Sequence, residues 1–208
     1  MPLFYQQNIN ENTKLAIWKI EEDEFFFDKN YVSNVAIKHT TKRIQHIAGR
    51  YLLQLLYPEL PIHAIIISTS NKPFLKDESF YFSISHTSNY VAAIVSKTNK
   101  VGIDVEINDD RIFNIKNKFL SEAELTRFKC NTLNNTTPLL TLLWCCKETI
   151  FKWWGKGNVD FKKMIEIKIF NKNVQGSIDA NFCDKSNKHY PLQLQYKLFD
   201  DLVLTYIV

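Results

Sequence analysis

The chain has 208 residues, of which 45% are hydrophobic and 13% aromatic, which indicates a folded globular protein and excludes a disordered one. Its 26 Lys and Arg against 22 Asp and Glu give a net charge of +4, too small a basic excess to indicate nucleic-acid binding. The N-terminal stretch lacks the pattern of a signal peptide, and no apolar run approaches a membrane span. We therefore expect a cytoplasmic protein with one large domain or two small halves, and with no nucleic-acid or membrane partner.

Periodicity predicts the elements of the first half. A long helix is expected from about Val32 to Tyr57, because Pro58 ends it. The motif NKP forms a turn in which Asn71 tolerates left-handed backbone. The aromatic run Phe25–Phe27 is interpreted as packing against the core rather than as a binding patch. Strands are expected at 14–20, 62–69 (buried), 80–86 and 90–96.

The stretch VGIDVEI (101–107) carries two acidic residues in a run that alternates like a strand. A strand points residues i and i+2 to the same side, so Asp104 and Glu106 should share one face. The alternative is that this face is simply solvated.

The stretch LLWCCKETIFKWWGKG (142–157) predicts a helix with a polar stripe, because Trp144, Glu148 and Lys152 recur at i, i+4 and i+8. If this stripe meets the acidic strand, three carboxylates and an ammonium converge. Such a cluster suits a hard divalent cation and a phosphate. The alternative is an ordinary helix ion pair between Glu148 and Lys152, worth ~0.2–0.5 kcal/mol.

The second half begins after a polar junction at 108–111, so we expect units at 1–107 and 108–208. Ser121 and Glu124 form a capping box that starts a helix. After a loop at 131–138, the signature helix opens at Thr137 or Pro138. Strands are expected at 164–170, 190–198 and 202–208.

The four cysteines show no C-x-x-C spacing. Adjacent helical positions point about 100° apart, so Cys145 and Cys146 are poor common metal ligands. We expect Cys130, Cys145, Cys146 and Cys183 to be buried or half-buried apolar residues in a reducing compartment.

The pair GIDVE (102–106) and WCCKETIFK (144–152) resembles the signature of the 4′-phosphopantetheinyl transferases, G-[IV]-D-[IVL]-E and W-x-x-K-E-[AS]-x-x-K. NKP (71–73) resembles their G-K-P segment with Asn71 for glycine, and FSISH (82–86) resembles F-[SN]-x-S-H. The likeness covers residues 40–155. It implies an α+β fold of the longer, surfactin-synthetase-activating type: a pseudo-twofold pair of similar halves, each with an antiparallel sheet packed by a long helix.

The resemblance implies an enzyme that transfers the 4′-phosphopantetheine arm of coenzyme A to a serine of an acyl or peptidyl carrier protein. The released product would be adenosine 3′,5′-bisphosphate, and Mg²⁺ the cofactor. Such enzymes serve lipid, polyketide or peptide synthesis. Because both halves lie in one chain, we expect a monomer.

The resemblance also assigns roles to residues of the signature. Asp104, Glu106 and Glu148 would hold the metal, and Lys152 would add positive charge on the transferring phosphate. Glu148 is also the candidate base for the serine hydroxyl, and the sequence leaves its two roles open. Lys147 could equally reach the phosphates or point outward.

Coenzyme A would be bound by basic residues of the first half. Arginines and lysines of the long helix bind its 3′-phosphate in this family, and Arg is favoured because its fork grips phosphate bidentately. The residues that we expect to contact coenzyme A are Arg43, Arg50, Lys72, Ser85, His86 and Lys152. The apolar residues Ile112, Phe113, Phe119 and Leu120 would either dock the carrier protein or pack the core.

Two other functions compete with transfer. A catalytically silent family member would bind coenzyme A or a carrier protein, although the presence of all four signature residues argues against it. An unrelated divalent-metal phosphoesterase would need only the carboxylates. It would not need the FSISH and NKP motifs, and their presence in this order argues against it.

Overall fold

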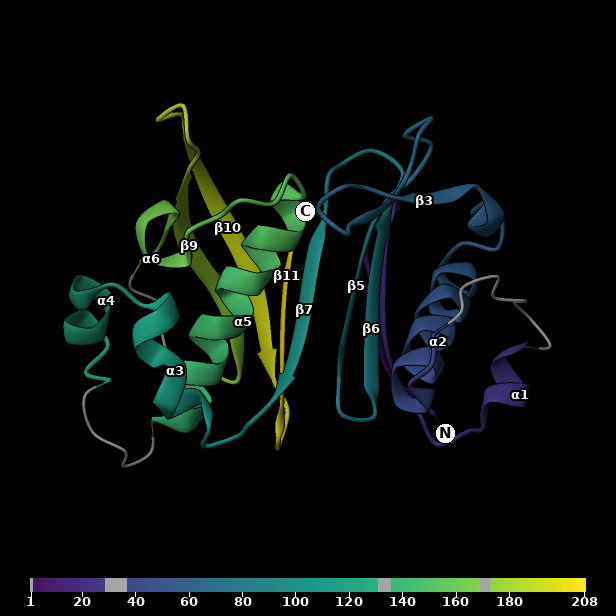
Figure 1. Ribbon diagram of the computed structural model, residues 1–208, viewed down its shortest axis with the longest axis horizontal. Coiled ribbons are helices and arrows are strands. Elements are labelled where there is room, and N and C mark those ends of the chain that lie inside the picture. Colours follow the sequence, from purple (N-terminus) through teal and green to yellow (C-terminus); the bar gives the residue numbers. More distant parts are fainter. Residues whose placement is uncertain (1, 29–36, 131–135, 169–172) are drawn as a thin grey trace. The chain divides into compact units, whose positions relative to one another are not determined.

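The computed structural model describes residues 2–28, 37–130, 136–168 and 173–208. Its contacts divide the chain into two compact units, residues 1–103 with Val208 and residues 104–207. Helices and antiparallel sheets confirm the predicted α+β class (Figure 1). The division falls inside a strand, a few residues before the expected boundary at Ile107. No helix of the described residues is long and apolar enough to span a bilayer.

The N-terminal unit contains a four-stranded sheet, a long helix and a two-stranded sheet (Figure 1). Its elements are β1 (Leu3–Asn10), β2 (Thr13–Lys19), α1 (Glu24–Asp28), α2 (Thr40–Leu56), η1 (Ile62–Ala64), β3 (Ile65–Ile67), β4 (Pro73–Leu75), β5 (Tyr81–Thr87) and β6 (Tyr90–Ser96). The large sheet has the order β1-β2-β6-β5, with antiparallel neighbours. Helix α2 packs its apolar stripe on this sheet, where Leu52 and Leu53 are fully buried in one core with Val91, Ala93 and Val95 of β6.

Gly49 allows a close approach between α2 and β5. A Cβ at this position would lie 3.0 Å from Cγ2 of Ile84, so a larger residue would push the helix and the strand apart. This approach matters for the basic side chains described below, because Arg50 follows Gly49 on the helix and His86 lies two residues after Ile84 on the strand.

Several expectations for this unit need correction. Helix α2 begins at Thr40 rather than near Val32, and residues 32–36 lie outside the described residues. The segment 62–69 is not a buried strand: β3 pairs only with the short β4, and Ile66 and Ile67 are 43% and 56% exposed. Strand β1 was not predicted; its residues alternate between half-buried and exposed positions.

The C-terminal unit is built around helix α5 and a five-stranded sheet in the order β7-β11-β10-β9-β8 (Figure 1). Its elements are β7 (Gly102–Ile107), α3 (Ile112–Phe119), α4 (Glu122–Arg127), α5 (Thr137–Trp154), α6 (Phe161–Met164), β8 (Ile165–Ile167), β9 (Gln175–Cys183), β10 (His189–Leu198) and β11 (Leu202–Ile207). Thr205 of β11 donates a hydrogen bond to the carbonyl of Cys145 at 2.9 Å, which fixes the middle of α5 on the sheet.

The ends of the helices follow the predicted signals. Helix α5 begins at Thr137 with Pro138 in its first turn, and it ends before Gly155, whose φ of 70° is left-handed. Ser121 and Glu124 form the predicted capping box of α4. The strand expected at 164–170 is the three-residue β8, and residues 169–170 lie outside the described part; β9 was not predicted.

The buried residues of this unit settle two further expectations. Cys130, Cys145 and Cys146 are buried and Cys183 is half-buried, all as free thiols, which confirms the expected burial. Phe119 and Leu120 are 1% and 0% exposed, so they belong to the core rather than to a docking surface. Ile112 and Phe113 are partly buried against the same core.

Candidate active site

The acidic face of β7 meets the polar stripe of α5, as the two periodicities predicted. The ammonium of Lys152 donates to Oδ1 of Asp104 at 2.5 Å, and the indole Nε1 of Trp144 donates to Oε1 of Glu106 at 3.1 Å. Asp104 is only 2% exposed, so its charge is held in a region of low dielectric. The pairing therefore brings the signature residues of both motifs together within the C-terminal unit.

Glu148 lies between these two contacts along α5. Burial raises its pKa to about 7, and the charge of Asp104 adds to this, while Lys152 opposes it and Glu106 contributes less. A carboxyl group with this pKa exchanges its proton near neutral pH, which is the property that a general base or acid needs.

Lys152 keeps its charge in this environment. Burial disfavours the ammonium, but the ion pair with Asp104 and the charge of Glu148 outweigh it, so that the pKa of Lys152 is raised. A permanent cation beside two carboxylates offers a point charge for an anionic substrate.

The donor set fits a hard divalent cation in its chemistry. Asp104, Glu106 and Glu148 supply carboxylate oxygens, which Mg²⁺ prefers. Burial is the main cause of the raised pKa of Glu148, and a cation would relieve the smaller contribution from repulsion by Asp104 and Glu106. Among the described residues, however, no three His, Cys, Asp or Glu side chains are grouped as a ready metal site. In this structure Lys152 and Trp144 hold Asp104 and Glu106, and the metal role of the carboxylates stays a prediction.

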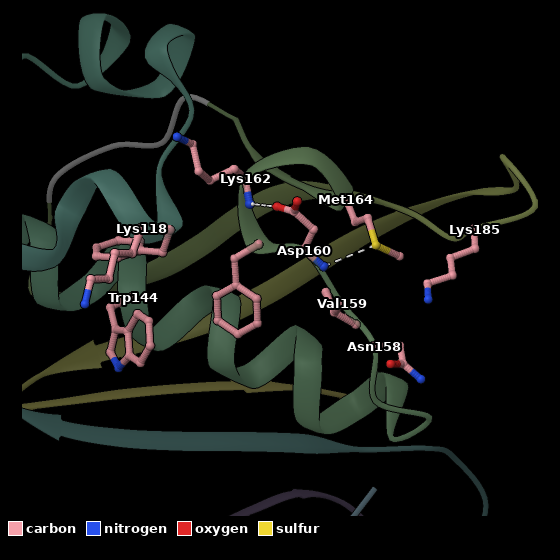
Figure 2. A pocket seen from close by; sticks show the side chains of 10 residues that line it. Lys118, Trp144, Asn158, Val159, Asp160, Lys162, Met164 and Lys185 are labelled. Atoms are coloured by element: carbon pink, nitrogen blue, oxygen red, sulfur yellow. Dashed lines mark hydrogen bonds between the residues drawn. The ribbon is translucent and has the colours of Figure 1, made fainter.

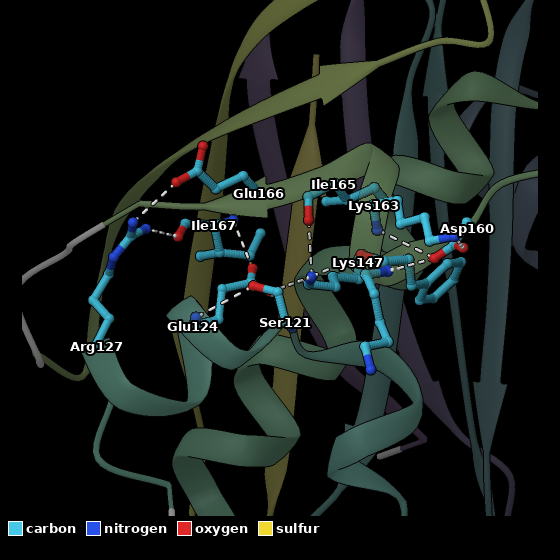
Figure 3. A network of polar contacts seen from close by, with 11 residues as sticks. Ser121, Glu124, Arg127, Lys147, Asp160, Lys163, Ile165, Glu166 and Ile167 are labelled. Carbon is cyan, nitrogen blue, oxygen red and sulfur yellow. Dashed lines mark hydrogen bonds and ion pairs between the residues drawn. The ribbon is translucent and has the colours of Figure 1, made fainter.

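Lys147, the other lysine of the motif, points neither outward nor to open space. It is fully buried, and its ammonium donates at 2.8 Å to Oε2 of Glu124 and to the carbonyls of Phe161 and Ile165 (Figure 3). All three donors are satisfied by the protein. The motif residue left open by the sequence therefore has an internal, structural set of partners.

A basic cluster lies in the N-terminal unit. His46 and Arg50 are one helical turn apart on α2, and burial lowers the pKa of His46, with further contributions from Arg50 and His86. The predicted Arg50 and His86 thus both act on His46, a residue that sequence reasoning missed. The i, i+4 spacing of His46 and Arg50 was the available signal.

The other predicted coenzyme A residues of this unit are in different settings. Arg43 grips Glu24 with two hydrogen bonds, at 2.5 and 2.6 Å, and also donates to the carbonyl of Ile37. Lys72 follows Asn71, whose φ of 62° confirms the left-handed turn. Burial lowers the pKa of Lys72 to about 8, with a smaller effect of Lys100. Ser85 is 4% exposed on β5, beside the exposed His86.

An open pocket of about 730 Å³ lies beside Trp144 in the C-terminal unit (Figure 2). Its lining combines apolar and aromatic side chains with lysines. The lining residues are Lys118, Phe119, Trp144, Asn158, Val159, Asp160, Phe161, Lys162, Met164 and Lys185. Trp144 lines this pocket and donates its indole N–H to Glu106, so the pocket adjoins the acidic cluster.

Comparison with known proteins agrees with this geometry. A 4′-phosphopantetheinyl transferase superfamily model matches residues 100–207. A protein of Haemophilus influenzae named "Putative 4′-phosphopantetheinyl transferase" is 27% identical over 156 residues, which are 73% of this chain and 64% of that protein. The chain thus spans less than two thirds of its relative's length. The family model includes both motifs, and we conclude that the chain belongs to the 4′-phosphopantetheinyl transferase superfamily.

Proposed function

We propose that this protein transfers the 4′-phosphopantetheine arm of coenzyme A to a serine hydroxyl of an acyl or peptidyl carrier protein. The observation that carries the proposal is the arrangement of Glu148, with a pKa of about 7, next to the Lys152–Asp104 ion pair. A proton acceptor and a fixed cation on adjacent turns of one helix are what a phosphoryl transfer requires.

In the proposed reaction the serine oxygen bonds to the β-phosphorus of coenzyme A. The bond from this phosphorus to the bridging oxygen breaks, and adenosine 3′,5′-bisphosphate leaves with the electron pair. Glu148 accepts the serine proton, and Lys152 neutralises charge on the transferring phosphate. Mg²⁺, when held by Asp104, Glu106 and Glu148, would supply further positive charge to the pyrophosphate oxygens.

The remaining parts of coenzyme A would be bound outside this cluster. We propose that Arg50, His86 and His46 bind a phosphate, because the charges of Arg50 and His86 both act on the ring of His46 and a phosphate would neutralise this repulsion. Lys72, Ser85 and Arg43 are proposed further contacts; Arg43 would exchange Glu24 for phosphate. The pocket beside Trp144 offers room and apolar surface for the flexible arm. Monomeric state and cytoplasmic location stay predictions.

The test is the intact mass of an apo carrier protein after incubation with this protein, coenzyme A and Mg²⁺. A gain of one phosphopantetheine arm, abolished by a chelator and by Asp104→Ala, would support the transferase and its metal requirement together. No gain on several acyl and peptidyl carriers, with coenzyme A still binding in calorimetry, would favour a silent binding protein. Release of phosphate without mass gain would favour a phosphoesterase.

The two proposed roles of Glu148 are separable by Glu148→Gln. Loss of a metal ligand should raise the Mg²⁺ concentration needed for half-maximal rate. Loss of a base should lower kcat at saturating Mg²⁺ and remove the acid limb of its pH profile.

A further inference from the structure

A buried ion pair outside the proposed catalytic cluster connects four elements of the C-terminal unit. Lys147 of α5 and Glu124 of α4 are 0% and 1% exposed. Burial lowers the pKa of Lys147, and Glu124 opposes this shift. A buried pair of this kind is weak as a source of stability, because desolvation offsets much of the attraction. Its presence in the signature helix therefore calls for another explanation.

The carboxylate of Glu124 is as fully bonded as the ammonium of Lys147. Its Oε2 accepts from the backbone N–H and the hydroxyl of Ser121, at 2.9 and 3.0 Å, as well as from Lys147. Its Oε1 accepts from the backbone N–H of Ile167 in β8 at 3.0 Å. With every oxygen and proton engaged, the pair has one geometry and fixes the elements that it touches (Figure 3).

The acceptors of Lys147 lead back to the candidate active site. Its bond to the carbonyl of Phe161 anchors α6, and Phe161 lines the pocket together with Trp144. The ring of Phe161 lies 5.7 Å from that of Trp144, and 5.8 Å from that of Phe151. Trp144 in turn donates its indole N–H to Glu106. A continuous set of contacts thus joins the buried pair to a carboxylate of the acidic cluster.

We propose that the Lys147–Glu124 pair is a positioning device: it anchors α6 so that Phe161 packs on Trp144 and Trp144 presents its indole N–H to Glu106. Lys147 is then a positioning residue and not a phosphate ligand, since its ammonium has no donor left for substrate. The catalytic consequence rests on the proposed transferase function; the packing consequence does not.

Three substitutions and a matched control test this role. Glu124→Gln and Lys147→Met disrupt the pair, and Phe161→Leu removes the aromatic contact while leaving the pair intact. Arg127→Ala is the control, because the side chain of Arg127 also ties α4 to β8, through Glu166 and the carbonyl of Ile167. It should lower stability without moving Trp144.

The first measurement is independent of activity. Protein with ¹⁵N-labelled tryptophan gives an indole N–H signal for Trp144, assigned with Trp144→Phe. We expect this signal to shift in Glu124→Gln, Lys147→Met and Phe161→Leu, and to stay in place in Arg127→Ala. If it stays in place in Phe161→Leu, the contact with Phe161 does not position Trp144, and the proposal is overturned even where the charge variants fail to fold. If it stays in place in a folded Glu124→Gln or Lys147→Met, the pair does not position Trp144, and the proposal is overturned as well.

The second measurement compares the effect of each substitution on kcat with its effect on the Kd for coenzyme A. Glu124→Gln and Lys147→Met should lower kcat by about 10–100-fold, as is typical of residues that orient a metal-ligating group, with the Kd for coenzyme A changed less than about threefold. A Lys147→Met variant that folds but binds coenzyme A more than about tenfold more weakly would identify a phosphate ligand and overturn the proposal. Absence of transfer by the wild type would refute the proposed function, while the indole signals would still decide the positioning role.

Discussion

The raised pKa of Glu148 makes a quantitative prediction about stability and pH. The folded protein holds this proton with a pKa of about 7, against 4.5 for an unperturbed glutamate. The unfolded chain therefore loses the proton first as pH rises. Below about pH 4.5 this group costs the folded protein no stability. Between about pH 4.5 and pH 7 the free energy of unfolding falls, and above that range the full loss is present.

The magnitude follows from the two pKa values. At 1.36 kcal/mol per unit of pKa, their difference corresponds to about 3 kcal/mol, mostly the cost of ionising a buried carboxyl beside Asp104. Glu148→Gln removes this cost. Relative to the wild type, the variant should gain about 3 kcal/mol of stability between pH 4.5 and pH 7.5. Saturating Mg²⁺ at pH 7.5 should stabilise the wild type and have less effect on the variant.

The assay is urea denaturation in the presence of chelator, followed by circular dichroism at several pH values and constant ionic strength. Glu122→Gln is the control, because Glu122 is an exposed carboxylate of the same unit. Its stability difference from the wild type measures, at each pH, the effect of removing an exposed carboxylate. If the difference for Glu148→Gln changes with pH by less than about 1 kcal/mol more than that of the control, Glu148 is not the buried, repelled carboxyl described above.

Three further changes have defined outcomes. Because the pKa of Lys72 is about 8, coenzyme A affinity measured by calorimetry should fall as pH rises from 7 to 9, and this dependence should vanish in Lys72→Met; equal pH dependence in both would exclude Lys72 from the phosphate site. Lys152→Met should lower kcat by about 10²–10³-fold in the carrier mass assay, and a rate within a few-fold of wild type would remove Lys152 from the reaction. Gly155→Ala should cost about 1–2 kcal/mol, seen as a lower melting temperature, because φ is 70° there; an unchanged melting temperature would contradict this.

Local patterns predicted the parts of the site that depend on periodicity. Alternation in 101–107 placed Asp104 and Glu106 on one face, and the i, i+4, i+8 stripe placed Trp144 and Lys152 opposite them. Both signals are local, since a strand and a helix repeat over a few residues. The left-handed backbone at Asn71 was expected from the resemblance instead, because Asn71 stands where the family has glycine and Asn tolerates positive φ.

Properties that depend on distant neighbours were not predictable in this way. The run of isoleucines in β3 indicated a buried strand, yet burial requires a covering element, and β3 pairs only with β4. His46 gained its place in the basic cluster from His86, a residue 40 positions later on another element. Which segments lie against these residues depends on tertiary packing, and a local sequence pattern does not indicate it.

The two lysines of the signature show where the limit lies. Lys147 and Lys152 are five residues apart on α5, so at 100° per residue their side chains point about 140° apart. Helical geometry alone thus places the two ammonium groups on different faces of α5. It does not say which one is internal, because that depends on α4, α6 and β8 closing over Lys147 and on β7 placing Asp104 beside Lys152. The same charged group, repeated along one helix, is therefore used once to hold the fold and once, as we propose, to carry the chemistry.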